Sequence, residues 1–105
     1  MNELTAHDAD EYAAWFRCLA DGTRLRILSV VAAADDPITV GEIVDRVDKS
    51  QSTVSRHLQV LAAERFVFTE ADGVRTLVRV NRDCMTALPD AAAAVMGLSR
   101  DRAER

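Results

Sequence analysis

A run of small polar and basic side chains between residues 50 and 59 has the clearest capacity for molecular recognition. Serine and arginine can contact phosphates, and glutamine and arginine can read adenine and guanine through paired hydrogen bonds. No acidic residue occurs from position 49 to position 63, so nothing within this stretch repels phosphate. The candidate DNA-contacting residues here are Ser50, Gln51, Ser52, Thr53, Ser55, Arg56, His57 and Gln59.

Two cysteines are the second set of side chains that could carry chemistry. Cys18 and Cys84 can act as ligands or nucleophiles, and Cys84, expected at a helix N-terminus beside Arg82, would have a lowered thiol pKa. The two thiols could also oxidise to a disulfide and serve as a redox switch. The simpler alternative is packing, because free cysteine is among the most frequently buried residue types. The residues alone leave these three interpretations open.

The net charge of −4 is unevenly distributed along the chain. Residues 49–82 carry six basic and three acidic side chains, whereas residues 1–48 carry four basic and ten acidic side chains. Because electrostatic attraction acts within roughly 10 Å at physiological salt, one basic segment can attract phosphate although the remainder is acidic. The charge pattern therefore permits nucleic-acid binding by residues 49–82.

The length of 105 residues predicts a single domain, with an arm over residues 1–7 and a charged tail over residues 99–105. No apolar run reaches the roughly 18 residues of a membrane span, and the acidic N-terminus does not resemble a secretory signal. The expected location is the cytoplasm, where cysteines are normally thiols. No membrane partner and no required cofactor are expected.

Four helices are predicted in the first two thirds of the chain, over residues 8–20, 23–34, 39–47 and 51–64. Apolar residues recur in them at spacings of three and four, which is typical of one buried helical face. The residues expected to face the core from the last three of these helices are Leu25, Ile27, Leu28, Val31, Val40, Ile43, Val44, Val47, Val54, Leu58 and Leu61.

Polar residues mark where these helices begin and end. Asp21 or Thr23 can cap the second helix. Thr39 followed by Glu42 predicts a capping box at the start of the third helix. The three residues 48–50 then form a short turn, so the third and fourth helices read as a helix-turn-helix.

The pattern changes after residue 65. Residues 66–71 and 74–80 are rich in β-branched and aromatic residues and flank Asp72-Gly73, which predicts a β-hairpin. Arg75 follows the hairpin tip, where a wing would contact a minor groove or the DNA backbone. A final helical segment is expected from about residue 83, restarting at Pro89, with Leu88, Ala92, Val95 and Met96 along one side and an end near Gly97. The predicted fold class is mainly α with a β-hairpin wing, a winged helix-turn-helix.

Two segments of the sequence resemble the ArsR/SmtB family of metal- and arsenic-responsive repressors. They are residues 18–28, CLADGTRLRIL, and residues 50–61, SQSTVSRHLQVL. The resemblance extends over roughly residues 10–96 and implies a homodimer paired through its first and last helices. It also implies binding to operator DNA that an inducer releases. Residues 81–84, NRDC, with LPDA and VMG further on, are similar to an arsenic-responsive actinobacterial branch.

The resemblance implies that the dimer contacts lie on the first and last helices. The interface residues expected from it are Tyr12, Trp15, Phe16, Leu88, Ala92 and Val95.

The usual metal sites of that family are missing from this sequence. Residues 38–43 contain no cysteine pair, and the last helix offers Asp83 but no histidine. The candidate inducer ligands are therefore Cys18 and Cys84, on the two helices that the resemblance brings together. Arsenite or another thiophilic ion suits two or three sulfur ligands, whereas zinc needs about four ligands. His7, Asp8 and Asp10 are the only further candidates near the N-terminus.

Other functions are compatible with parts of this sequence. Polar residues opposite an apolar stripe also occur on any solvated helix, and a winged helix can serve as a protein-interaction module without an inducer site. A repressor that responds to thiol oxidation would use the same two cysteines. No glycine-rich phosphate loop, metal cluster or nucleophile–base pair is evident, so the chain is not expected to be an enzyme.

Overall fold

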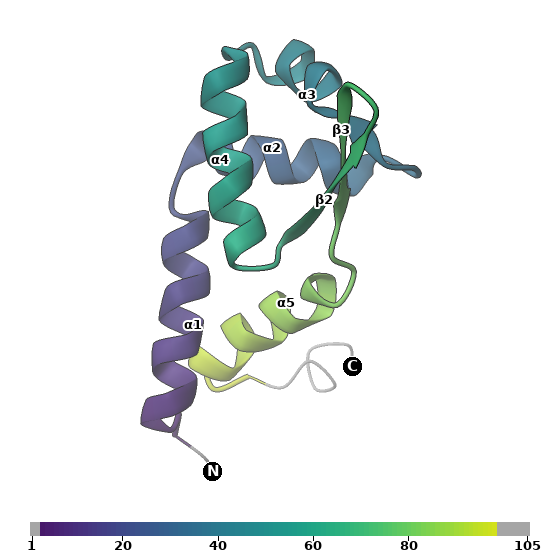
Figure 1. Ribbon diagram of the computed structural model, residues 1–105. Helices are drawn as coiled ribbons and strands as arrows, with labels where there is room; N and C mark the ends of the chain where they lie inside the picture. The colour runs from purple at the N-terminus through teal and green to yellow at the C-terminus, as the bar shows by residue number, and fades with distance from the viewer. Residues whose placement is uncertain (1–2, 99–105) are drawn as a thin grey trace.

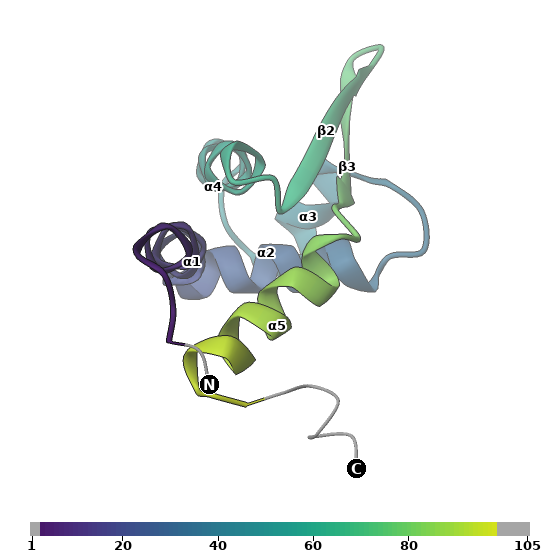
Figure 2. The ribbon, with the colours of Figure 1, turned by 90° about the horizontal axis from the view of Figure 1, so that it is seen from below.

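Eight helices and strands make up residues 3–98, which are the residues that the computed structural model describes. The elements are α1 (Ala6–Leu19), α2 (Gly22–Ala33), β1 (Ile38–Thr39), α3 (Val40–Val47), α4 (Gln51–Ala63), β2 (Val67–Asp72), β3 (Arg75–Val80) and α5 (Cys84–Val95). In Figure 1, α1 and α5 lie at the lower end of the molecule, and α3 and the start of α4 lie at the upper end. The hairpin of β2 and β3 projects from the helical body in Figure 2. The predicted winged helix-turn-helix is confirmed.

Side-chain caps begin the first four helices where the sequence provides them. Thr5 accepts a hydrogen bond from the Asp8 amide, so α1 begins at Ala6, two residues earlier than predicted. Asp21 caps α2 through the amide of Arg24. The capping box of Thr39 and Glu42 is present at the start of α3. These local hydrogen bonds satisfy amides that the first turn of a helix leaves free.

The core lies where α2, α3, α4 and the sheet meet. Its fully buried members include Ile27, Ile43, Val54 and Leu61. Leu25 was expected in the core, but it is 50% exposed. Leu25 precedes Ile27 by two residues, which is about 200° around a helix, so the two side chains cannot share a face.

The sheet has a third strand that the sequence pattern did not predict. Strand β1 pairs with β3, and the antiparallel order is β1-β3-β2. Two residues are too few to show the alternation that identifies a strand. The hairpin turn also lies one residue later than predicted, because Asp72 pairs with Arg75 and leaves Gly73 and Val74 as the loop. Gly73 has a positive φ of 64°, as the first position of a type II′ turn requires.

Helix α5 runs without interruption from Cys84 to Val95, with Pro89 in its interior. The expected restart at Pro89 is therefore wrong. Proline removes the bond to the carbonyl of Met85, and both residues lie on the exposed side, where water lessens that loss. The helix ends at Val95, close to Gly97 as expected, and Gly97 follows the C-cap Met96 with a positive φ of 72°.

The inner side of α5 holds its first turns on the core. Ala91 is buried, and Cys84 and Leu88 pack against the core. Ala92, Val95 and Met96 are exposed in the single chain. Because the helix is continuous, these three residues and Leu88 lie along one side, as predicted.

Candidate nucleic-acid interface

Helix α4 presents the predicted polar side to solvent. Val54, Leu58 and Leu61 are at most 4% exposed and fix one side of the helix on the core. Between residues 51 and 59 of α4, the exposed side chains are those of Gln51, Ser52, Arg56 and Gln59. The polar surface from residue 51 to residue 59 is therefore open, and the start of the helix places free amides and a partial positive charge beside it.

The hydroxyls of Ser50 and Thr53 take part in hydrogen bonds at the start of α4. The Ser50 hydroxyl caps α4 by accepting the Thr53 amide at 3.2 Å. The same hydroxyl lies 2.9 Å from the Thr53 hydroxyl and 3.3 Å from that of Ser52. Ser50 is exposed and Thr53 is half-buried. Their first role is to orient the start of α4.

His57 departs from the predicted surface. Its ring is half-buried and its Nδ1 lies 3.1 Å from Nη1 of Arg24 on α2. One turn of the helix separates residues by 3.6 positions, so residue 57 lies on a flank when residues 54, 58 and 61 face the core. The structure separates His57 from Ser52, Arg56 and Gln59, with which it had been grouped.

The wing carries a paired arginine close to its tip. Nη2 of Arg75 lies 2.6 Å from Oδ2 of Asp72, and both side chains are more than half exposed. Val74 in the turn between them is fully exposed. Further from the tip, the guanidinium of Arg79 stacks 4.5 Å from the ring centre of Phe68. Arg75 thus lies where it was predicted, but a carboxylate partly neutralises it.

A groove of about 260 Å³ separates α4 from the wing. Ser55 and Gln59 line it from α4, and Thr69 and Thr76 line it from β2 and β3. The two threonines were not among the DNA-contacting residues predicted from the sequence. They could have been predicted as such, because they are exposed on a hairpin that follows a helix-turn-helix. The groove gives four polar side chains a common surface beside the exposed side of α4.

The two thiols lie on either side of the end of α4. Cys18 is 5% exposed, and its Sγ donates to the carbonyl of Val60 at 3.7 Å. Sγ of Cys84 donates to the carbonyl of Arg65 at 3.3 Å. Burial raises the pKa of the Cys18 thiol. Burial and the nearby Asp83 carboxylate raise the pKa of Cys84, so the predicted lowering is wrong.

No group of three or more histidine, cysteine, aspartate or glutamate side chains within residues 3–98 is arranged to hold a metal ion. His7, Asp8 and Asp10 all lie in the first turns of α1, because the helix begins at Ala6. Within that same part of the chain, no helix is long and apolar enough to cross a bilayer. The expected charged tail over residues 99–105 lies outside the described residues.

The residues expected at a dimer interface divide into two groups. Trp15 and Leu88 pack against the core, and the rings of Tyr12 and Trp15 lie 5.4 Å apart. The exposed group consists of Phe16, Ala92 and Val95. Further exposed apolar side chains on α5 or directly after it are Met85, Met96 and Leu98. An apolar surface therefore remains on α1 and α5.

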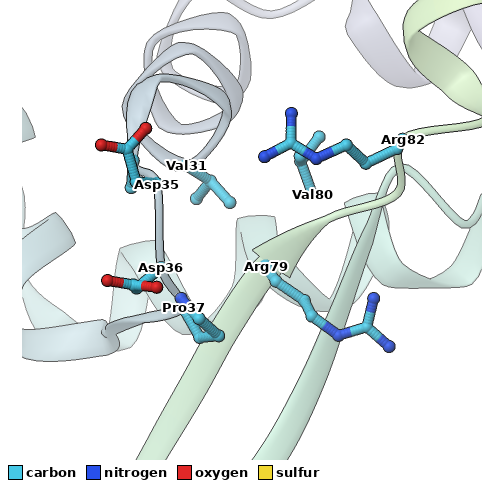
Figure 3. Close-up of a pocket in the computed structure, with 8 residues that line it drawn as sticks. Val31, Asp35, Asp36, Pro37, Arg79, Val80 and Arg82 are labelled. Carbon is cyan, nitrogen blue, oxygen red and sulfur yellow. The ribbon is translucent and has the colours of Figure 1, made fainter.

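A second polar pocket, of about 170 Å³, lies away from the wing tip, near the base of β3. Asp35 and Asp36 line it from the segment after α2, and Arg79 and Arg82 line it from the end of β3 and beyond. Figure 3 shows that the carboxylates point away from the guanidinium groups. Opposite charges border this pocket without a direct ion pair between them.

Known proteins share this helix-turn-helix. Residues 19–67, which contain α2, α3 and α4, match the model of a helix-turn-helix domain. The chain is 37% identical over 68 residues to the HTH-type transcriptional regulator KmtR of Mycobacterium tuberculosis. That match covers 65% of this chain and 51% of KmtR, so the chain spans about half the length of this curated relative.

Solved structures share the fold over almost the whole chain. NolR from Sinorhizobium fredii is 25% identical, with a TM-score of 0.69, over 94% of this chain and all of NolR. The homodimeric winged helix-turn-helix domain Mb0332 from Mycobacterium bovis, a possible ArsR-family regulator, is 24% identical with a TM-score of 0.68 and covers 91% of each chain. The chain therefore has the winged helix-turn-helix fold, and it is similar over most of its length to solved regulators of the ArsR family.

Proposed function

We propose that the protein is a transcriptional regulator that binds duplex operator DNA through α4 and the wing. The observation that carries this proposal is the exposed, acid-free side of α4 formed by Gln51, Ser52, Arg56 and Gln59. A helix of this kind enters the major groove with its N-terminal residues at the base edges. The relative KmtR is an HTH-type transcriptional regulator, which supports the proposal of a regulatory function for this chain.

Each side chain on this surface has a role set by its chemistry. Arg56 suits guanine, and Gln51 and Gln59 suit adenine, through paired hydrogen bonds. Ser52 and the capped helix start suit phosphate, and Arg75 on the wing suits a minor groove or a phosphate. Ser55, Thr69 and Thr76 border the groove that would lie beside the same DNA backbone.

The test is a gel shift with the DNA upstream of the protein's own gene. Arg56→Ala should reduce specific affinity by about 1–3 kcal/mol, which is the worth of one bidentate base contact. Arg82→Ala is the matched control, because it removes an exposed arginine that follows β3 and borders the pocket near the base of that strand, outside α4 and the wing. If Arg56→Ala, Arg82→Ala and the natural protein bind the operator with equal specific affinity, the assignment of α4 to the DNA interface is wrong.

We also propose that the functional unit is a homodimer. The exposed apolar side chains of α1 and α5 need a cover in water, and exposed apolar patches of this kind mark interaction sites. Mb0332, which shares the fold, is a homodimer. Two copies of α4 held about 34 Å apart would reach successive major grooves.

The inducer that we propose is arsenite or a related thiophilic species captured by Cys18 and Cys84. Arsenous acid condenses with two thiols to form two arsenic–sulfur bonds and release two water molecules, so arsenic stays trivalent. Both S–H groups would then be lost as donors to Val60 and Arg65 at the end of α4. A thiol-redox response would use the same two thiols, and because thiolate is the reactive form in both cases, the raised pKa values of Cys18 and Cys84 should slow either reaction.

Native mass spectrometry and gel shifts with arsenite test the inducer. Arsenite should add one arsenic per pair of thiols and release the DNA, and Cys84→Ser should remove both effects. The more buried Cys18 should react more slowly, and Cys18→Ser should also remove the response. A full arsenite response in Cys84→Ser would exclude Cys84 as a ligand, and release by peroxide but not arsenite would favour the redox alternative.

A further inference from the structure

Arg24 joins three helices at the flank of α4. Its Nε donates to the carbonyl of Cys18, in the last turn of α1, at 2.6 Å. Its Nη1 lies 3.1 Å from Nδ1 of His57 on α4. Its backbone amide is held by the Asp21 carboxylate that caps α2. One side chain from α2 therefore contacts both the end of α1 and the middle of α4.

The contact with His57 constrains α4 in a way that apolar packing does not. Val54, Leu58 and Leu61 hold the helix on the core, but hydrophobic burial is non-directional. A hydrogen bond has a preferred length and angle. Within residues 3–98, the Arg24–His57 contact is the only side-chain hydrogen bond that joins another helix to α4 between Gln51 and Gln59. Arg56, which is exposed on the outer side, precedes His57 directly, so a rotation of His57 about the helix axis also turns Arg56.

The chemistry of this contact depends on the protonation of His57. Arginine is always a donor, so Nδ1 must be the acceptor, and the ring must be neutral with its proton on Nε2. Protonation would place two donors and two positive charges against each other. Among the charged groups of residues 3–98, Arg24 contacts the ring directly, and the carboxylate of Asp21, the N-cap of α2, interacts with His57 electrostatically. The neighbouring contact on α1 is the carbonyl of Cys18, which carries no charge.

We propose that Arg24 and His57 form a positioning pair that holds α4 in its DNA-binding orientation, and that protonation of His57 weakens operator binding. This inference depends on the proposed function. It predicts the opposite of what a DNA-contacting histidine would do, since a protonated histidine at a phosphate strengthens binding. The sign of the pH effect therefore separates positioning from contact.

Operator affinity measured at about pH 8 and at about pH 5.5 tests the pair, because the lower pH favours a protonated ring. The natural protein should bind about tenfold more weakly at the lower pH, the loss expected for one charge-assisted hydrogen bond. His57→Gln, whose carbonyl oxygen can accept at either pH, should bind equally at both. The chain has two histidines, so His7→Gln is the matched control and should retain the natural pH profile.

A measurement without DNA tests the same contact. Long-range proton–nitrogen NMR of the folded protein at about pH 8 should show the His57 proton on Nε2. Arg24→Gln should shift that tautomer preference and weaken DNA binding at the higher pH. Circular dichroism would verify that this variant remains folded.

The outcomes separate the two proposals. Absence of operator binding at either pH, with the Nε2 tautomer present, would overturn the proposed function and leave no DNA-binding role for the pair. Operator binding that strengthens in acid, or that weakens equally in His57→Gln, would overturn the positioning pair and leave DNA binding intact. A proton on Nδ1 would also overturn the pair.

Discussion

Arg65 has an unfavourable backbone conformation at the end of α4. Its φ of 63° is in the left-handed region, which favours glycine. The conformation ends α4: the amides of Arg65 and Phe66 turn back to the carbonyls of Ala62 and Leu61. The carbonyl of Arg65 then receives the Asn81 side chain at 2.8 Å and the Cys84 thiol at 3.3 Å. A strained residue thus connects the end of α4 to α5.

Arg65→Gly should stabilise the protein, because glycine adopts this conformation without a Cβ clash and keeps the carbonyl. The expected gain in the free energy of unfolding is about 0.5–1 kcal/mol, or roughly 5 °C in Tm. Arg65→Lys retains the strain and should leave Tm unchanged. Thermal unfolding of both variants measures the difference, and a lower Tm for Arg65→Gly would show that the arginine side chain stabilises this turn.

Asp72 restrains the wing arginine and should limit its contact with DNA. Asp72→Asn would free Arg75 and remove a negative charge from the tip, so operator affinity should rise about threefold and the salt slope should steepen by about one. Glu70→Gln is the matched control, since Glu70 is an exposed acid on the same strand without a bond to Arg75. Folding stability should hardly change, because exposed ion pairs contribute little. Equal gains in both variants would assign the effect to net charge alone.

At the scale of elements, α3 is short and depends on its cap. It has eight residues, and its capping box joins it to β1, because Thr39 belongs to the strand and caps the helix. Arg26 from α2 donates to the carbonyls of Val47 and Arg46 at the other end. Both ends of this helix, which precedes α4 in the helix-turn-helix, are thus fixed by side chains.

Thr39→Ala should lower the free energy of unfolding by about 1 kcal/mol, the usual worth of an N-cap hydroxyl. The lost bond is the one that the Glu42 amide donates to the Thr39 hydroxyl at 3.1 Å. Thr39→Ser retains that hydroxyl and should recover most of the stability in urea unfolding. If serine and alanine are equally destabilising, the threonine methyl in the strand is the important group instead.

At the scale of the whole molecule, the two ends of the structure have different surfaces. The end with α3, the start of α4 and the wing tip (Figure 1) carries the exposed polar side chains of α4, and α1, α5 and the residues directly after α5 carry most of the exposed large apolar side chains. This division suits a dimer that joins at one end and binds DNA at the other.

Val95→Glu should convert the dimer to a monomer and weaken operator binding, because it places a charge in the apolar surface of α5. Val95 is 50% exposed in the single chain, so the substitution should not disturb the core. Val74→Glu, at the fully exposed wing tip, is the control that should remain dimeric. Sedimentation velocity distinguishes the two states, and a dimeric Val95→Glu would exclude this part of α5 from the interface.

The sequence by itself determined the parts of this protein that depend on short-range patterns. The spacing of apolar residues identified four of the five described helices with errors of two residues or fewer at their ends, and Thr39 with Glu42 identified the capping box. The same periodicity placed Arg56 and Gln59 on the outer side of α4, because Val54 and Leu58 had to face inward. A helix of 3.6 residues per turn converts such spacing directly into faces.

Only the tertiary structure decided which residues meet across the chain. Strand β1 exists because β3 lies beside it, and α5 continues through Pro89 while Cys84 and Leu88 pack on the core. The contact with Arg24, 33 positions away, separates His57 from Ser52, Arg56 and Gln59, and burial raises the pKa values of both thiols. Partners, burial and charge at such distances are products of the folded chain, and no local spacing encodes them.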